Sequence, residues 1–210
     1  MTDIRSRFAS CGDDVVVEPG VEIAHPELWS VGDGVRIGHG TLASDRSRVR
    51  LGHGSCFRAY SFIQGTGRLE VGDNVTFYPY SYLSLGDENG RTTIGSDTHF
   101  APGCALYGQY GLTVGHHVNV AAHVVLATVQ HDPRDLGVPM SGTGTGAPIE
   151  LADDVWLGAN VSITPGGAVA SGSIVGAGAV VTTALTTEKG LYVGVPAKLL
   201  RTRAPGERPR

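Results

Sequence analysis

The amino-acid sequence predicts an all-β fold in which short strands joined by tight turns wind the chain round a prism. Aliphatic residues recur every six positions, most clearly at Leu151, Leu157, Ile163, Val169, Val175 and Val181. A small residue follows each of them, and Gly and Pro (31 and 11 of 210 residues) are frequent without a collagen period. A period of six fits neither an amphipathic helix nor a long alternating strand, whereas a coil built from short strands repeats at this spacing.

Shorter runs with the same spacing cover the rest of the chain. They are Val17/Ile23, Val31/Ile37, Leu51/Phe57/Ile63/Leu69, Val71/Phe77/Leu83, Ile94/Phe100/Leu106/Leu112 and Val114/Val120/Leu126. One residue of each six is expected to point to the axis, and stacked coils are expected to pair about 4.8 Å apart. The sequence also contains an aromatic-rich set, Phe62, Phe77, Tyr78, Tyr80 and Tyr82. Some of these residues are expected in core or stacking positions, and the others on an outward face that an oligomer would cover.

The period predicts one domain over residues 1–201 with a single large interruption. The count of six stops at His131 and resumes at Leu151, and the stretch between them is rich in Pro and Gly. We expect an extruded loop at 132–148, an N-terminal extension at 1–14 and a disordered tail at 202–210. Because a loop of this length without structure of its own is uncommon in a compact domain, the interruption indicates a functional segment.

Composition excludes several classes of protein. The net charge of −4 argues against nucleic acid or an anionic membrane as partner. Cys11, Cys56 and Cys104 are widely spaced and form no CxxC motif, which favours a reduced setting over a disulfide framework or a zinc knuckle. The first residues lack the apolar run of a signal peptide, and no window is apolar enough to span a bilayer. We therefore expect a soluble, cytoplasmic protein.

His131 stands at the root of the predicted loop. An imidazole titrates near neutral pH and can accept a proton from a reacting group. The alternative is an ordinary solvated loop histidine. The break in the repeat and the loop that follows favour a catalytic role.

Four segments in order resemble the hexapeptide-repeat acyltransferases, and in particular the galactoside and maltose O-acetyltransferases. They are TVGHHVNVAAHVVLATVQHDPRD (113–135), APIELADDVWLGANVSITPG (147–166), IVGAGAVVT (174–182) and GVPAKLLR (194–201). The resemblance implies a left-handed parallel β-helix over roughly residues 15–201. It also implies a homotrimer whose active sites lie between neighbouring prisms.

The resemblance further implies acetyl-CoA as co-substrate, with no metal, and direct transfer to a hydroxyl of a sugar, glycan or sugar-containing metabolite. His131 is the implied general base, and the backbone N–H of Ala159 the implied oxyanion donor. The other implied coenzyme contacts are Trp156 with the pantetheine arm or the acceptor, Ala177 and Thr182 with the pantetheine amides, and Lys198 and Arg201 with the phosphates. Gln109 and His123 are candidates for contact with the acceptor.

The acceptor half departs from the galactoside and maltose enzymes. Their N-terminal helical segment has no counterpart, their turn asparagine falls at Gly103, and a nearby acidic position falls at about Gln109. The closer likeness is to the branch that modifies cell-surface polysaccharides, nucleotide sugars or secondary metabolites.

Several alternatives stay open at this point. The enzyme could acylate the nitrogen of an amino sugar, or an antibiotic. A γ-class carbonic anhydrase would use histidines such as His116, His117 and His123 for zinc, although their spacing does not match that signature. A non-catalytic binding prism would lack coenzyme affinity, and the β-helical tail of a nucleotidyltransferase would need a Gly-rich nucleotide domain upstream.

Overall fold

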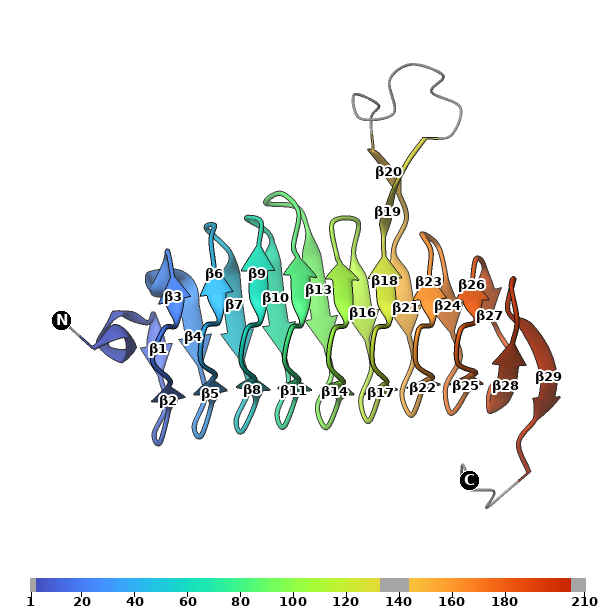
Figure 1. The fold of residues 1–210 in the computed structure, drawn as a ribbon, viewed down its shortest axis with the longest axis horizontal. Helices are drawn as coiled ribbons and strands as arrows, with labels where there is room; N and C mark the ends of the chain where they lie inside the picture. Colours follow the sequence, from blue (N-terminus) through green and yellow to red (C-terminus); the bar gives the residue numbers. More distant parts are fainter. Residues whose placement is uncertain (1–2, 133–143, 205–210) are drawn as a thin grey trace.

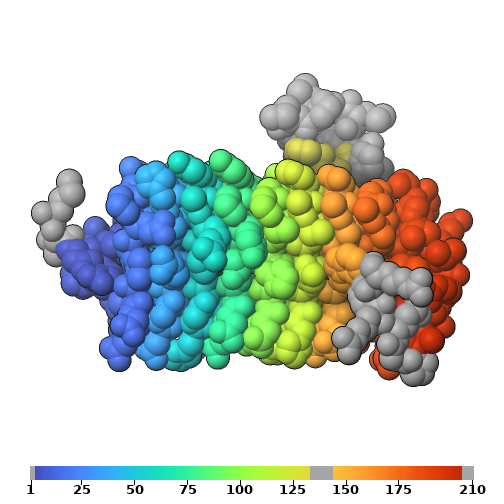
Figure 2. Space-filling model, turned by 60° about the horizontal axis from the view of Figure 1, so that its bottom comes forward, coloured from blue at the N-terminus to red at the C-terminus, as the bar shows by residue number. Residues whose placement is uncertain are grey.

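Stacked parallel strands form a three-sided prism in the computed structural model, which describes residues 3–132 and 144–204 (Figure 1). Each coil of the chain contributes one strand to each of three sheets, here called A, B and C. Space-filling atoms show the coils following one another along the prism from the N-terminal to the C-terminal end (Figure 2). The predicted all-β fold, a parallel β-helix of hexapeptide repeats, is confirmed.

The strands of the three sheets are short. Sheet A contains β1 (Ser10–Cys11), β4 (Trp29–Val31), β7 (Arg48–Leu51), β10 (Arg68–Val71), β13 (Arg91–Ile94), β16 (Leu112–Val114), β21 (Ile149–Leu151), β24 (Ala168–Val169) and β27 (Ala184–Leu185). Sheet B contains β2 (Val16–Val17), β5 (Arg36–Ile37), β8 (Cys56–Phe57), β11 (Thr76–Phe77), β14 (His99–Phe100), β17 (Asn119–Val120), β22 (Trp156–Leu157), β25 (Ile174–Val175), β28 (Gly190–Val193) and β29 (Lys198–Thr202). Sheet C contains β3 (Glu22–Ile23), β6 (Leu42–Ala43), β9 (Phe62–Gln64), β12 (Tyr82–Ser84), β15 (Ala105–Tyr107), β18 (Val125–Ala127), β23 (Ser162–Ile163) and β26 (Val180–Val181).

The remaining elements lie outside this stack. Two 3-10 helices, η1 (Ile4–Arg7) and η2 (Pro26–Leu28), lie at the N-terminal end. An antiparallel hairpin, β19 (Val129–His131) and β20 (Gly144–Gly146), projects from the side of the prism (Figure 1). No helix among the described residues is long and apolar enough to cross a membrane.

The three corners of the prism differ in the insertions that they carry. We call them the A/B, B/C and C/A corners, after the sheets that each turn connects. Most coils repeat after 20 residues, as the pairs Ser10↔Ser30 and Ser30↔Arg50 show. The offset grows to 23 residues at Glu70↔Thr93 and to 37 at Thr113↔Glu150, and both insertions lie at the C/A corner. The hairpin is the larger insertion.

Two residues of each six point inward, rather than the one that the period predicts. Leu157 and Ile163 are buried as expected, but so are Val155 and Val161, two positions before them. The reason is that a turn residue also folds its side chain into the prism beside the strand residue. The backbone turns with positive φ at Asn160 and at equivalent residues in other coils, three positions after the aliphatic rather than next to it.

Aromatic side chains stack along the axis of the first coils. Phe57 and Phe77 lie 4.5 Å apart and Phe77 and Phe100 lie 5.0 Å apart between ring centroids, with nearly parallel planes. Trp29 caps this stack on the N-terminal side and contacts Phe8. Thus Phe77, among the aromatic residues noted in the sequence, belongs to the core, and the other four lie outside it.

The β-helix extends slightly beyond the predicted boundaries at both its N-terminal and its C-terminal end. Ser10 and Cys11 already pair with sheet A, within the predicted extension 1–14. Thr202 still belongs to β29, and Arg203 donates to the carbonyl of Gly172 at 2.8 Å, so the fold passes the predicted boundary at 201. Residues 205–210 of the predicted tail and 133–143 of the predicted loop lie outside the described part of the chain.

Candidate active site

His131 lies at the outer end of strand β19, where the chain leaves sheet C at the C/A corner. Its side chain borders a recess of about 210 Å³, whose other walls are Tyr107, Ala127, Val129, Gln130 and Gly144. The histidine is exposed, and it belongs to the hairpin β19–β20. A substrate hydroxyl could therefore reach the imidazole from solvent.

The root of the hairpin is held by a small hydrogen-bond network. Thr128 Oγ1 accepts the backbone N–H of Tyr110 at 3.0 Å and donates to the carbonyl of Tyr107 at 2.7 Å. The Tyr110 hydroxyl donates to the carbonyl of Gly144 at 2.9 Å, across the base of the hairpin. A Cβ atom at Gly146 would lie 2.3 Å from the Tyr110 ring, so this position requires glycine. Sequence reasoning missed Tyr107, Tyr110 and Thr128, because no motif distinguishes them.

Gln109 lies one coil earlier at the same C/A corner. Its amide nitrogen donates to the hydroxyl of Ser84 at 3.1 Å, while its buried Oε1 has no hydrogen-bond partner among the described residues. A buried acceptor without a partner is costly in a folded protein. Gln109 does not itself line the recess beside His131.

The residues implied for coenzyme contact gather mostly on sheet B and the B/C corner. Trp156, Ile174, Leu191 and Arg201 are direct neighbours across strands β22, β25, β28 and β29. Ala159 and Ala177 occupy consecutive turns at the B/C corner, where Gly178 N–H donates to the carbonyl of Ala159 at 2.8 Å.

Around these residues the coils pack closely and the surface carries positive charge. A Cβ atom at Gly158 would lie 2.6 Å from the backbone nitrogen of Ala177, which explains the glycine there. Lys198 is exposed opposite Val193, and with Arg201 it makes this end of sheet B basic.

The remaining implied site residues lie at the B/C and C/A corners. His123 lies at the B/C corner with positive φ, and its ring covers Gly103, where a Cβ atom would lie 2.5 Å from His123 Nδ1. Thr182 is exposed at the C/A corner, on the same side as His131.

Within one chain, the implied site residues form two groups at different corners of the prism. His131, Gln109 and Thr182 follow strands of sheet C, whereas Ala159 and Ala177 precede strands of that sheet. Since strands of sheet C run in parallel, the two groups lie at opposite ends of those strands. The implied base and the implied oxyanion donor therefore do not meet within a single copy.

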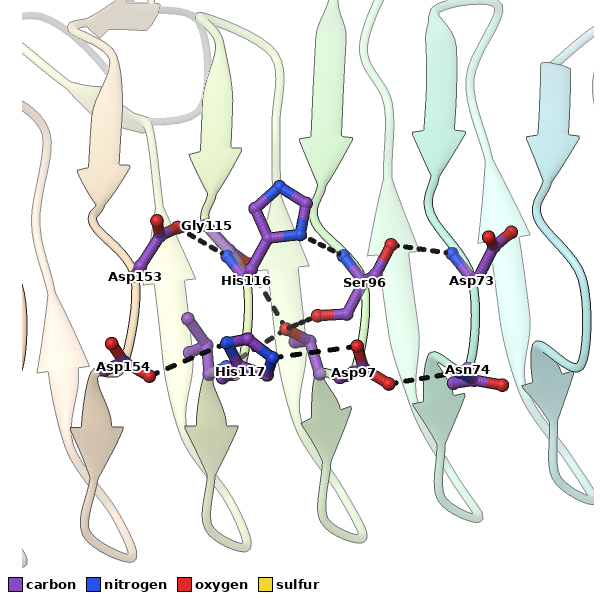
Figure 3. Close-up of polar contacts among 11 residues, drawn as sticks. Asp73, Asn74, Ser96, Asp97, Gly115, His116, His117, Asp153 and Asp154 are labelled. Atoms are coloured by element: carbon purple, nitrogen blue, oxygen red, sulfur yellow. Dashed lines mark hydrogen bonds and ion pairs between the residues drawn. The ribbon is translucent and has the colours of Figure 1, made fainter.

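The histidines considered above as zinc ligands make hydrogen bonds and ion pairs within the turns of the prism. At the A/B corner, Nδ1 of His116 accepts the backbone N–H of Ser96 at 3.0 Å, and the N–H of His116 donates to Asp153 at 2.7 Å (Figure 3). His117 lies between Asp97 and Asp154, at 3.7 and 3.6 Å (Figure 3). His123 lies at another corner, and the described residues hold no group of three or more metal-ligating side chains.

Comparisons with known proteins point to acetyltransferases. No protein-family model matches the chain. A Schizosaccharomyces pombe protein named as an acetyltransferase is 41% identical over 90 residues, which are 43% of this chain and 42% of that protein. The galactoside O-acetyltransferase of Escherichia coli is 29% identical over 131 residues, 62% of each chain. The chain thus spans less than two thirds of the length of these curated relatives.

Solved structures share the fold. The polySia-specific acetyltransferase NeuO superposes with a TM-score of 0.56 at 20% identity, over 96% of this chain and 92% of NeuO. The S84A mutant of AntD, an N-acyltransferase from Bacillus cereus, was solved with dTDP-4-amino-4,6-dideoxyglucose and coenzyme A, and it has a TM-score of 0.53 at 20% identity, over 95% and 86% of the two chains. The resemblance to the galactoside and polysaccharide O-acetyltransferases is confirmed at the level of sequence similarity and fold.

Proposed function

We propose that this protein is an O-acetyltransferase that moves an acetyl group from acetyl-CoA to a hydroxyl of a sugar, a glycan or a sugar-containing metabolite. The observation that carries the proposal is His131 beside a recess of about 210 Å³ at the base of the hairpin, in a chain similar to named acetyltransferases. The coenzyme enters as a substrate, with Lys198 and Arg201 on its phosphates.

The chemistry needs a base, an oxyanion donor and no covalent enzyme intermediate. His131 takes the proton of the acceptor hydroxyl while that oxygen attacks the thioester carbonyl carbon. The backbone N–H of Ala159 stabilises the negative oxygen of the tetrahedral intermediate. When the intermediate collapses, the carbon–sulfur bond breaks and the imidazolium returns its proton to the leaving thiolate.

The position of these groups calls for a second copy of the chain. Since His131 and Ala159 lie at opposite ends of the sheet C strands, a complete site takes His131 from one copy and the B/C corner from its neighbour. A contact between two different corners is heterologous and can close into a ring of copies, and we propose that three copies close it as a homotrimer.

The test is release of free thiol from acetyl-CoA in the presence of sugars, amino sugars, nucleotide sugars and hydroxylated natural products. His131→Ala should reduce turnover at least about a hundredfold, because general-base catalysis contributes roughly 10²–10⁴ in rate. Amino sugars as the preferred acceptors would assign N-acylation instead.

His25→Ala is the matched control, since His25 contacts Glu27 near the N-terminal end of the prism. It should retain wild-type turnover, and both variants should keep the wild-type oligomer in size-exclusion chromatography. Near-normal turnover of folded His131→Ala would remove the assigned base.

A further inference from the structure

Over strands β6, β9, β12, β15 and β18, the outward face of sheet C is apolar and aromatic, unlike that of sheet A. On sheet A, Arg48, Arg68 and Arg91 are direct neighbours on three strands. On sheet C, strands β6, β9, β12, β15 and β18 carry no charged residue in the described chain. Their outward side chains include Phe62, Tyr82 and Tyr107.

These three rings form a continuous row that leads to the proposed base. The ring centroids of Tyr107 and Tyr82 are 5.3 Å apart, and those of Tyr82 and Phe62 are 5.9 Å apart. Gln64 donates to the Tyr82 hydroxyl at 2.6 Å, which fixes the tilt of the middle ring. Tyr107 also lines the recess beside His131, next to the small side chain of Ala127.

A second pair of rings borders this row at the B/C corner. Tyr60 and Tyr80 stack 5.6 Å apart with their planes 7° from parallel, and 49% and 64% of their surfaces are exposed. Both residues have φ near +60°, a conformation that bulky side chains rarely adopt. Glycine occupies the equivalent turn at Gly40, where a Cβ atom would lie 2.7 Å from the Tyr60 ring. Tyrosine at these turns strains the backbone, so folding alone does not account for it.

The chemistry of this surface suits a carbohydrate. The recess of about 210 Å³ is smaller than the roughly 300–1,000 Å³ typical of sites for drug-sized ligands, so it holds about one ring. Further rings of a longer acceptor would lie on Tyr82 and Phe62. Aromatic faces interspersed with the hydroxyls of Tyr60 and Tyr80 match pyranose rings, which carry C–H groups on their faces and hydroxyls on their edges.

We propose that Tyr107, Tyr82 and Phe62, together with the Tyr60–Tyr80 pair, bind the successive rings of a neutral oligosaccharide or polysaccharide acceptor. This inference rests on the proposed function, since it extends the acceptor site from His131 over sheet C. The absence of charge on strands β6, β9, β12, β15 and β18 favours a neutral glycan over an anionic one.

The experiment compares binding of N-acetylglucosamine with that of chitotetraose and cellotetraose, by calorimetry on the full chain without coenzyme. At least one tetrasaccharide should bind the wild type at least tenfold more tightly than the monosaccharide. Tyr82→Ala should weaken tetrasaccharide binding about tenfold, as expected for one lost ring contact. Tyr82→Phe should keep most of the affinity, because it retains the ring.

The double variant Tyr60→Gly/Tyr80→Gly tests the corner pair with a residue that fits the turn. Glycine accepts positive φ, so this variant should keep the turns of the wild type in circular dichroism, yet bind the tetrasaccharide about tenfold more weakly. Asn74→Gly, a positive-φ turn at the A/B corner, is the matched control and should bind normally.

Three results would overturn the proposal. The first is that neither tetrasaccharide binds the wild type, and the second is that binding does not depend on chain length. The third is that the ring variants leave binding unchanged and dissociate the oligomer. The last result would assign the rings to packing between copies. Chain-length-dependent binding without thiol release would refute the proposed function alone, and thiol release without chain-length dependence would refute the glycan surface alone.

Discussion

The A/B and B/C corners of the prism turn at single residues in the left-handed backbone region. Asn74, Asp97, His117 and Asp154 turn the chain at the A/B corner with φ near +57°. Asn and Asp tolerate this conformation better than most residues. Neighbouring turns add glycines where backbones touch, as at Gly52, where a Cβ atom would lie 2.4 Å from Gly72. Turn residues thus serve both local conformation and contact between coils.

The cysteines differ in how far burial suppresses ionisation. Burial raises the pKa of the Cys104 thiol to about 11, and it also raises the pKa of Cys56. Cys11 is exposed. Because the thiolate is the reactive form, we expect iodoacetamide at pH 8 to label Cys11 first and the other two only after unfolding. Mass spectrometry of the native protein should find one modified cysteine, and rapid labelling of Cys104 would contradict its burial.

The same shift predicts a loss of stability in alkali. The folded thiol of Cys104 stays protonated up to about pH 11, whereas the unfolded thiol ionises above its ordinary value of 9.0. The contribution of this group is therefore complete below pH 9 and is lost as the pH rises to 11, by at most about 1.4 kcal/mol per pH unit. Urea unfolding at pH 8 and 10.5 should show a larger loss for the wild type than for Cys104→Ala.

Along one coil, the short strands depend on the side chains stacked above and below them. Strand β11 contributes Phe77, whose ring lies between Phe57 and Phe100. Strands of two residues make few hydrogen bonds each, so burial of these rings provides much of the stability of the first coils.

Phe77→Ala should lower the free energy of unfolding by about 3–5 kcal/mol, because it leaves a cavity between two rings. Phe77→Leu should cost clearly less, since it fills part of that volume. Chemical denaturation monitored by circular dichroism checks both values. A loss below 1 kcal/mol for the alanine variant would show that the stack does not support the fold.

At the scale of the whole molecule, the candidate site is divided between two corners. His131 lies at the C/A corner and Ala177 at the B/C corner of each prism. Under the proposed function, a single chain presents half of a site on each side. Assembly is then part of the proposed chemistry rather than a stabilising addition.

Mixed oligomers test this division. His131→Ala and Ala177→Glu should each be inactive alone, the second because a bulky acid blocks the exposed corner proposed for the coenzyme. Unfolded and refolded together in equal amounts, they should regain about a quarter of wild-type activity, as random assembly returns one intact site in four. Mixtures as inactive as the separate variants would show that each copy carries a whole site.

The sequence by itself determined the architecture and pointed to His131. Inward side chains recur at a fixed spacing because each coil repeats the same short strands, so Leu157 and Ile163 could be placed from the pattern alone. The break after residue 131 was equally visible, since an insertion removes that spacing.

Only the tertiary structure decided which residues become neighbours. Tyr107 and His131 border one recess because the hairpin leaves sheet C at its C/A corner, and Tyr82 joins them from an earlier coil. Outward side chains obey no period, because solvent accepts nearly any residue there. Their role follows from the stacking of coils, which brings residues some 20 positions apart within contact distance.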